Sequence, residues 1–315
     1  MYPIQLIPVT KDYLWGGTRL KARWNKQASS ATIAESWELA CHPQGESVVL
    51  NGEHAGKSLG ALLREHPEYL GARAAQFPYF PLLIKFIDAA QDLSVQVHPS
   101  DAYALEHEGQ FGKTEMWYVA DCEEGSGVYC GFKRPLSAQQ VREHLDNGTI
   151  EQALHFLPLR KGDCVYIPSG TVHAIRGGML VCEVQQNSSL TYRLYDYGRL
   201  DKDGKARELH VDRAIPVICS DSVHRVNETV RAIDDTTREL VSCPYFTVYE
   251  HTVAGEKTIF VDADSFVSLT VVDGEGSVFV DGVRSNSKLG HTVFIPAGAG
   301  EVLLRGAMTV IAARV

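Results

Sequence analysis

The stretch GDCVYIPSGTVHAI, residues 162–175, places a strand directly before a tight turn. Aromatic and β-branched residues predict the strand, and Pro168 and Gly170 predict the turn that ends it. The stretch GHTVFIPAG, residues 290–298, has the same Gly-x5-Pro-x-Gly spacing and lies 128 residues further along the chain. The repeat predicts two β modules built alike, although two short segments can also resemble each other by chance.

Most of the remaining chain consists of short β-rich runs separated by Gly, Pro, Asn and Asp, which favours a sandwich or barrel of strands. Residues 58–71 predict a short helix with Ser58 as its N-cap. Residues 137–157 predict two short helices divided by the Asn147-Gly148 turn. The expected fold is therefore mainly β with a few short helices. A polar, weakly patterned stretch at 220–243 is the expected linker between modules.

The composition is that of an ordinary globular protein, with 315 residues, 44% hydrophobic and 22% charged. A net charge of −9 argues against general binding to nucleic acid or to an anionic membrane. No run approaches the ~18 consecutive apolar residues of a membrane span, and the first residues lack the pattern of a secretory signal. The seven cysteines are scattered singly, which favours a reduced, cytoplasmic chain.

The stretch SVQVHPSD, residues 94–101, predicts a strand with one polar and one apolar face. Side chains alternate along a strand, so Gln96 and His98 share one face while Val95 and Val97 share the other. Taken alone, the polar pair could face water or line a cavity.

The segment IPSGTVHAI completes the pattern Gly-x5-Pro-x-Gly-x2-His and resembles the second motif of the cupin superfamily. In that jelly-roll barrel the histidine, here His173, points inward at a metal. Cupins take their other ligands from an earlier His-x-His and a glutamate, which correspond here to QVH and to Glu115. However, 16 residues separate His98 from Glu115, more than in most cupins. This longer insertion is typical of one particular branch.

The segments YLWGG, AESWELACHP, LSVQVHPSD, KTE and IPSGTVHAI together resemble the short bacterial type I phosphomannose isomerases over about residues 10–200. The resemblance implies two cupin-like jelly-roll modules, a catalytic one at 1–235 and a smaller degenerate one at 236–315. It also implies one zinc per chain, although nitrogen and oxygen ligands alone would equally admit Fe, Mn or Co. The metal ligands that it implies are Gln96, His98, Glu115 and His173.

The activity that the resemblance implies is interconversion of mannose 6-phosphate and fructose 6-phosphate through an enediol. This reaction needs an electrophile for the carbonyl, a base near the carbon and a clamp for the phosphate. The resemblance implies catalytic roles for Lys113, Glu183 and Arg193. Substrate binding is assigned in the same way to Trp15, Lys85, Ser94, Arg193 and Arg199, and Glu35 and Trp37 match positions that shape the pocket.

The identity of the base stays open between Lys113 and Glu183. Lys113 shares a strand face with Glu115, and a divalent cation disfavours the charged form of a neighbouring lysine, as a base requires. The chain departs from better-known members at two positions, because Gly112 replaces a histidine and Ser189 replaces an aspartate. A proton shuttle through those two side chains cannot operate here.

Two other functions remain possible at this level: a non-catalytic cupin that binds sugar phosphates, and a metal-dependent cupin enzyme of other chemistry. We expect a phosphorylated hexose as the only class of partner and a monomer or weak homodimer. In the second module Glu301 stands where the first has His173, and no upstream histidine accompanies it. We therefore expect that module to be structural and free of metal.

Overall fold

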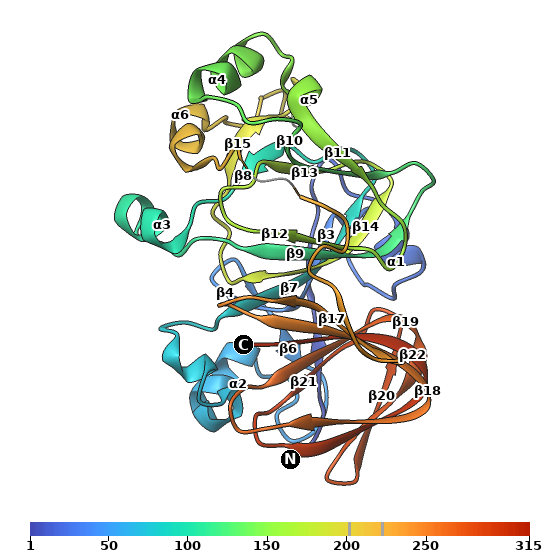
Figure 1. The fold of residues 1–315 in the computed structure, drawn as a ribbon. Coiled ribbons are helices and arrows are strands. Elements are labelled where there is room, and N and C mark those ends of the chain that lie inside the picture. Colours follow the sequence, from blue (N-terminus) through green and yellow to red (C-terminus); the bar gives the residue numbers. More distant parts are fainter. Residues whose placement is uncertain (201–202, 222–223) are drawn as a thin grey trace.

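The chain folds into two stacked lobes made mainly of strands, with a few short helices (Figure 1). The computed structural model describes residues 1–200, 203–221 and 224–315. The predicted fold class is confirmed. The boundary at residues 235 and 236 stays a prediction.

Two antiparallel sheets form the first lobe. The five-stranded sheet has the order β11 (Leu154–Pro158), β10 (Gly127–Phe132), β13 (His173–Ile175), β8 (Val95–Val97), β15 (Tyr192–Tyr195). The six-stranded sheet has the order β12 (Cys164–Ile167), β9 (Glu115–Cys122), β14 (Met179–Gln186), β7 (Leu82–Ala89), β3 (Glu35–Leu39), β2 (Val9–Lys11). A small ribbon of β4 (Cys41–His42) and β5 (Gly45–Glu46) stands apart.

A nine-stranded sheet forms the second lobe and also takes in strands from the N-terminal region. Its order is β16 (Arg231–Asp234), β17 (Thr237–Ser242), β18 (Thr247–Val261), β22 (Gly300–Arg314), β19 (Val267–Val280), β21 (Thr292–Ile295), β1 (Ile4–Ile7), β6 (Val48–Val49), with β20 (Val283–Lys288) paired to β19. The N-terminal strand therefore ties the two lobes together.

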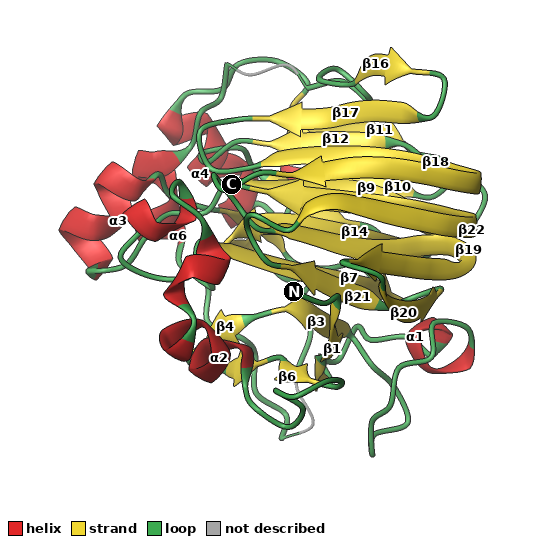
Figure 2. Cartoon of the chain, turned by 90° about the horizontal axis from the view of Figure 1, so that it is seen from below, coloured by secondary structure: helices red, strands yellow, loops and turns green. Residues whose placement is uncertain are grey.

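The helices are short and most lie together on one side of the strands (Figure 2). They are α1 (Arg19–Ala22), α2 (Leu59–Glu65), α3 (Asp101–Glu108), α4 (Ala138–Asp146), α5 (Ile150–Ala153), α6 (Val211–Ala214) and three 3-10 turns, Pro67–Leu70, Ala74–Gln76 and Ile215–Val217. Among the described residues, no helix combines the length and apolar character needed to cross a membrane.

The predicted helices are mostly confirmed. Ser58 caps α2 by accepting a hydrogen bond from the Ala61 backbone at 3.2 Å. The second helix predicted within 137–157 was too long, because residues 154–158 leave it to pair with β10. Tertiary pairing there outweighs local propensity. Helix α3 was not predicted, although Ser100 caps it within the long insertion.

The six-stranded sheet is buried on both faces, as β14 shows most clearly. Leu180, Cys182 and Val184 pack in a cluster shared with the second lobe, which includes Phe266 and Phe294. The alternate side chains, among them Glu183 and Gln185, turn to the opposite face of the sheet. Every residue of β14 is buried. The second lobe thus covers the back of the sheet that carries the polar side chains.

A buried ion pair also joins the lobes. The Lys26 amino group donates to Glu38 at 2.7 Å and to the backbone carbonyl of Gly290. Thr292 of the second lobe donates to the same carboxylate at 3.3 Å. Buried charges need such partners, so this network fixes β3 against β21.

The repeated turn has the same backbone conformation in both lobes. Gly170 has φ +87° and Gly298 has φ +76°, a region that side-chain-bearing residues rarely adopt. The leading glycines match as well, with φ +89° at Gly162 and +85° at Gly290. The sequence repeat therefore reflects a repeated structure.

The position equivalent to His173 differs between the lobes. Glu301 is exposed and pairs with Phe260 on the outer surface. Its alignment with His173 predicted that it would face the interior of the second barrel, and this prediction is wrong. Among described residues, only His98, Glu115 and His173 form a group of three or more such side chains with ligand atoms within 4.8 Å.

We therefore expect Glu301→Gln to leave both metal content and turnover unchanged. Elemental analysis of the purified, untagged wild-type chain should give close to one metal per chain, because one donor cannot hold a transition metal. Two metals per chain, or a loss of metal in Glu301→Gln, would mean that the second lobe has a site of its own.

Candidate metal centre and cavity

Two rows of side chains face each other between the sheets of the first lobe. In the five-stranded sheet Gln96 pairs with His173 on one side and with Arg193 on the other. In the six-stranded sheet Glu183 pairs with both Lys85 and Trp117. Directly paired residues point to the same side of a sheet, so register alone assembles most of the site.

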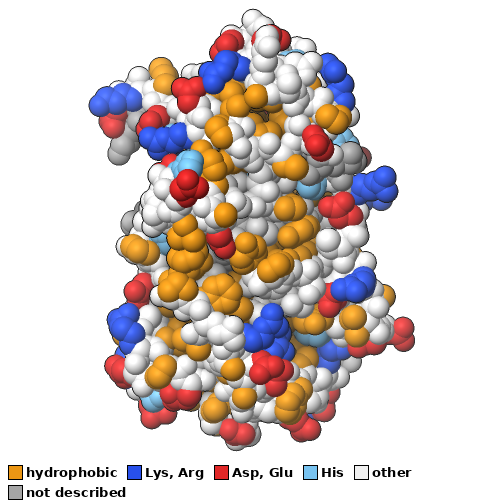
Figure 3. Space-filling model, turned by 60° about the vertical axis from the view of Figure 1, so that its left-hand side comes forward, with side chains coloured by type: hydrophobic (Ala, Val, Ile, Leu, Met, Phe, Trp, Pro, Cys, Tyr) orange, Lys and Arg blue, Asp and Glu red, His pale blue; other side chains and the backbone are white. Residues whose placement is uncertain are grey.

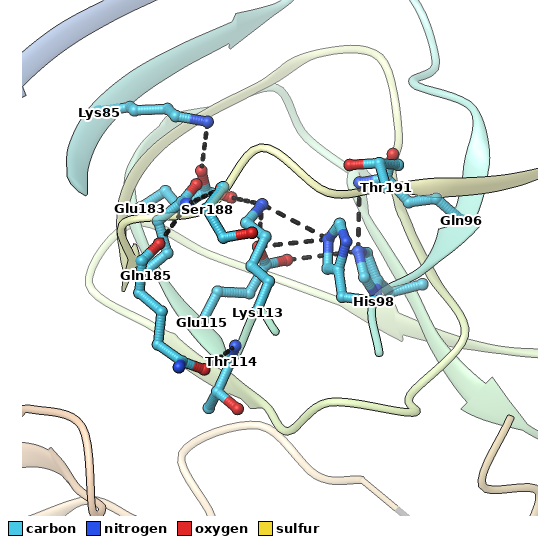
Figure 4. Close-up of polar contacts among 12 residues, drawn as sticks. Lys85, Gln96, His98, Lys113, Thr114, Glu115, Glu183, Gln185, Ser188 and Thr191 are labelled. Atoms are coloured by element: carbon cyan, nitrogen blue, oxygen red, sulfur yellow. Dashed lines mark hydrogen bonds and ion pairs between the residues drawn. The ribbon is translucent and has the colours of Figure 1, made fainter. Parts of the chain in front are cut away.

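A buried cluster of His98, Glu115 and His173 lies where these rows meet (Figure 4). The His98 Nε2 atom is 3.6 Å from one carboxylate oxygen of Glu115, and the His173 Nε2 atom is 3.3 Å from the other. Gln96 approaches the His173 Nε2 atom at 3.2 Å through its side-chain amide. A half-turn of that amide would direct its oxygen at the same point.

The hydrogen bonds of the two rings fix which nitrogen is available to a metal. The Nδ1 atom of His98 lies 2.8 Å from the Leu190 carbonyl, and the Nδ1 atom of His173 lies 2.9 Å from the Thr171 carbonyl. A carbonyl only accepts, so each Nδ1 carries the proton and each Nε2 presents a lone pair. This arrangement is typical of ligating histidines.

The electrostatics of the cluster fit a cation. Burial lowers the pKa of His173 to about 3 and lowers the pKa of His98 well below its ordinary value, so both rings stay neutral. Burial raises the pKa of Glu115. Lys113 forms an ion pair with one of its oxygens at 2.5 Å, and the other oxygen accepts no hydrogen bond among the described residues. Two imidazole lone pairs and an under-satisfied carboxylate are the donor set of a divalent metal.

Lys113 and Glu183, the two candidate bases, lie beside this cluster. The Lys113 amino group is 3.4 Å from the His98 Nε2 atom and 3.7 Å from Glu183. Burial opposes ionisation of Glu183, but Lys113 and Lys85 outweigh it and lower the pKa of Glu183 to about 2. The Trp117 indole also donates to this carboxylate at 3.0 Å. Glu183 is therefore held as a carboxylate.

Lys85 lies between two carboxylates at the wall of the cavity. Its amino group is 3.2 Å from Glu183 and 3.7 Å from Glu35. Burial lowers the pKa of Lys85, but Glu35 and Glu183 raise it above its ordinary value. Lys85 thus neutralises the carboxylates beside it.

A cavity of about 320 Å³ opens beside the cluster. Of the residues predicted from sequence, its lining includes Trp15, Lys85, Ser94, Gln96, Lys113, Glu183 and Arg193, together with Glu35 and Trp37. His98, Glu115 and His173 lie behind this lining and are at most 1% exposed. Arg199 is outside the lining, and its guanidinium donates to Asp196 and to the Asp92 carbonyl.

Sequence reasoning missed several residues of the cavity wall. Tyr13, Gln44, Trp117, Thr191 and Arg207 also line the cavity. Trp117 could have been found, because it lies two residues after Glu115 on the same strand face. Arg207 had no such signal, since it follows an irregular segment.

The structure also explains the glycine at position 112. A Cβ atom there would lie 2.4–2.5 Å from backbone atoms of residues 99–101. The start of α3 therefore occupies the space that a side chain would need. The histidine of better-known family members has no room in this backbone.

The jelly-roll sheets and the His–Glu–His cluster between them define a cupin with a metal site. Two family models match the chain: "Phosphomannose isomerase type I, catalytic domain" over residues 4–126, and "Mannose-6-phosphate isomerase, cupin domain" over residues 236–315. The chain belongs to the type I mannose-6-phosphate isomerase family.

Individual relatives agree over nearly the full length. The mannose-6-phosphate isomerase ManA of Bacillus subtilis is 39% identical over 309 residues, with 96% of each chain covered. The enzyme of Streptococcus mutans is 37% identical over 284 residues, covering 90% of this chain and 89% of its own. A crystal structure of the mannose 6-phosphate isomerase from Bacillus subtilis superposes with a TM-score of 0.91 at 35% identity, with both chains fully covered.

Proposed function

We propose that the chain interconverts mannose 6-phosphate and fructose 6-phosphate through an enediol, with one zinc ion held by Gln96, His98, Glu115 and His173. The observation that carries the proposal is the His98–Glu115–His173 cluster beside a cavity that also presents Lys113, Ser94 and Arg193. A bound divalent cation would stabilise the negative charge that develops on the enediol oxygens. The neutral, oriented rings support this role.

Lys113 is proposed to carry the proton between C1 and C2. Its amino group lines the cavity and lies within 3.4 Å of a ligand nitrogen. Glu183 is a weaker candidate, because Lys85, Lys113 and Trp117 hold it as a carboxylate of low pKa. We assign Glu183 the role of orienting Lys113 instead.

Arg193 and Ser94 are proposed to bind the phosphate. The Arg193 Nε atom donates to the Ser94 hydroxyl at 3.3 Å, and Nη1 donates to the Glu208 carbonyl at 2.9 Å. These bonds aim a planar donor set along the cavity wall, which suits a phosphate. Trp15 lines the same cavity.

The assay that tests the function follows formation of fructose 6-phosphate from mannose 6-phosphate by the purified chain. Turnover supports the isomerase. Binding of the substrate without turnover would instead support a non-catalytic sugar-phosphate-binding cupin, and neither binding nor turnover would leave a cupin enzyme of other chemistry.

The phosphate assignment predicts a large effect at Arg193. Arg193→Ala should lower kcat/KM for mannose 6-phosphate. The loss should correspond to at least ~2 kcal/mol of transition-state stabilisation, because a desolvated phosphate charge would lose its partner. Turnover of unphosphorylated mannose should fall far less. Equal losses on the two substrates would show that Arg193 acts on the sugar carbons or on folding.

For the remaining properties we propose a cytoplasmic protein that binds neither nucleic acid nor membrane and exists as a monomer or weak homodimer. The scattered single cysteines and the net charge of −9 support this proposal. On the face shown in Figure 3, acidic and basic side chains are interspersed rather than gathered into a basic patch.

A further inference from the structure

Two of the residues that line the cavity are arginines from β15 and from the chain beyond it. Arg193 lies on β15, and Arg207 comes from the irregular chain beyond that strand. Both line the cavity, together with Ser94. Arg199, to which the family resemblance assigned substrate binding, does not line it.

Arg207 is held by a buried carboxylate. Its Nε atom donates to one oxygen of Asp196 at 2.7 Å, and its Nη2 atom donates to the other. The Asp196 residue is 5% exposed, whereas the Arg207 side chain remains 24% exposed. The bidentate pair fixes the plane of the guanidinium through one edge, while the residue still faces the cavity.

Arg199 uses its donors differently. Nη2 and Nε donate to Asp196, and Nη1 donates to the Asp92 carbonyl. All three nitrogens are thus engaged, two with Asp196 and one with the Asp92 carbonyl. Arg199 therefore holds the Asp196 carboxylate, and Asp196 in turn holds the Arg207 guanidinium.

Among the described residues, Arg193 and Arg207 differ in how their charges are paired. Asp196 is shared between Arg199 and Arg207, while Arg193 contacts a hydroxyl and a carbonyl rather than a carboxylate. The Glu208 side chain is 77% exposed, so its charge is screened by water. Burial and the charge of Arg207 together lower the pKa of Arg193. Two guanidiniums that line one cavity favour an anion between them.

We propose that Arg207, rather than Arg199, is the second cation of the phosphate subsite, together with Arg193 and Ser94, and that Arg199 is a positioning residue that acts through Asp196. This inference rests on the proposed function, because it names residues that select a phosphorylated hexose. Phosphate is bound in the same way before and during isomerisation, so Arg207 contributes to KM and not to kcat.

The test compares Arg207→Ala and Arg207→Lys with Arg142→Ala, an exposed arginine paired with Asp212 on the outer surface. We expect Arg207→Ala to raise KM for mannose 6-phosphate by about 10-fold or more with kcat within about 3-fold of wild type. Arg207→Lys, which keeps the charge but loses the planar fork, should lie between. Arg142→Ala should match wild type.

Binding of glucitol 6-phosphate, which lacks a carbonyl and cannot isomerise, gives a readout independent of turnover. Calorimetry should show the same loss of affinity for glucitol 6-phosphate in Arg207→Ala. The affinity for glucitol, which has no phosphate, should be the same in every variant. An unchanged Kd and KM in folded Arg207→Ala, or a larger loss in Arg199→Ala than in Arg207→Ala, would overturn the inference. Failure of the wild-type chain to isomerise mannose 6-phosphate would instead overturn the proposed function.

Discussion

Removal of the bound metal with a chelator is expected to abolish isomerisation, and added zinc is expected to restore it. The negative charge that forms on the enediol oxygens would otherwise develop in a cavity where the Lys113 amino group is already paired with Glu115 and Glu183. The measurement is the rate of fructose 6-phosphate formation before chelation, after it and after metal is returned. Full activity in a rigorously metal-free preparation would contradict the mechanism.

Changes to the ligands should reproduce this loss. His98→Ala or His173→Ala should lose most of the metal, as elemental analysis would measure. Circular dichroism should stay close to that of wild type, because the strands that carry the two rings are held by backbone pairing and by apolar neighbours such as Val97 and Ala174. Retention of one metal in either variant would mean that the histidine is not a ligand.

Replacement of Lys113 by methionine is expected to lower kcat by about 10²–10⁴-fold, the range typical of a lost general base. Methionine keeps much of the side-chain length and removes the amino group that would carry the proton. Exchange of solvent deuterium into C1 or C2 of the sugar should fall in parallel, because the same proton transfer drives it.

Two controls separate this role from binding and from the second candidate base. Metal content and affinity for glucitol 6-phosphate should persist in Lys113→Met, because neither depends on proton transfer. Glu183→Gln should lose less activity than Lys113→Met, since Glu183 only orients the amino group. A greater loss of deuterium exchange in Glu183→Gln would reverse the two assignments.

The main features of the first barrel could be predicted from sequence because they are local. The Gly-x5-Pro-x-Gly turn needs a backbone with positive φ, and both copies adopt it. The alternation of Val95, Gln96 and Val97 likewise places the valines in an apolar cluster and Gln96 beside His173. Helix α3 was not predicted, although the Ser100 cap at its start is an equally local signal.

Other features depended on contacts between distant segments. Residues 154–158 form a strand because β10 offers a partner, and the short N-terminal strand β1 joins the sheet of the second lobe. No local pattern states which sheet a strand will join, since the pairing energy comes from the partner.

The sequence by itself determined the repeated turn, the alternation of faces and the His98, Glu115 and His173 motif positions. Only the tertiary structure decided which groups stand together at the cavity. Lys85 proved to lie between Glu35 and Glu183, and Arg207 reached the cavity where Arg199 did not. Strand register carries Lys85 to its partners, whereas a loop held by Asp196 carries Arg207. Spacing along the chain fixes a side chain within a strand, but beyond the end of a strand its position depends on the tertiary contacts that hold the loop.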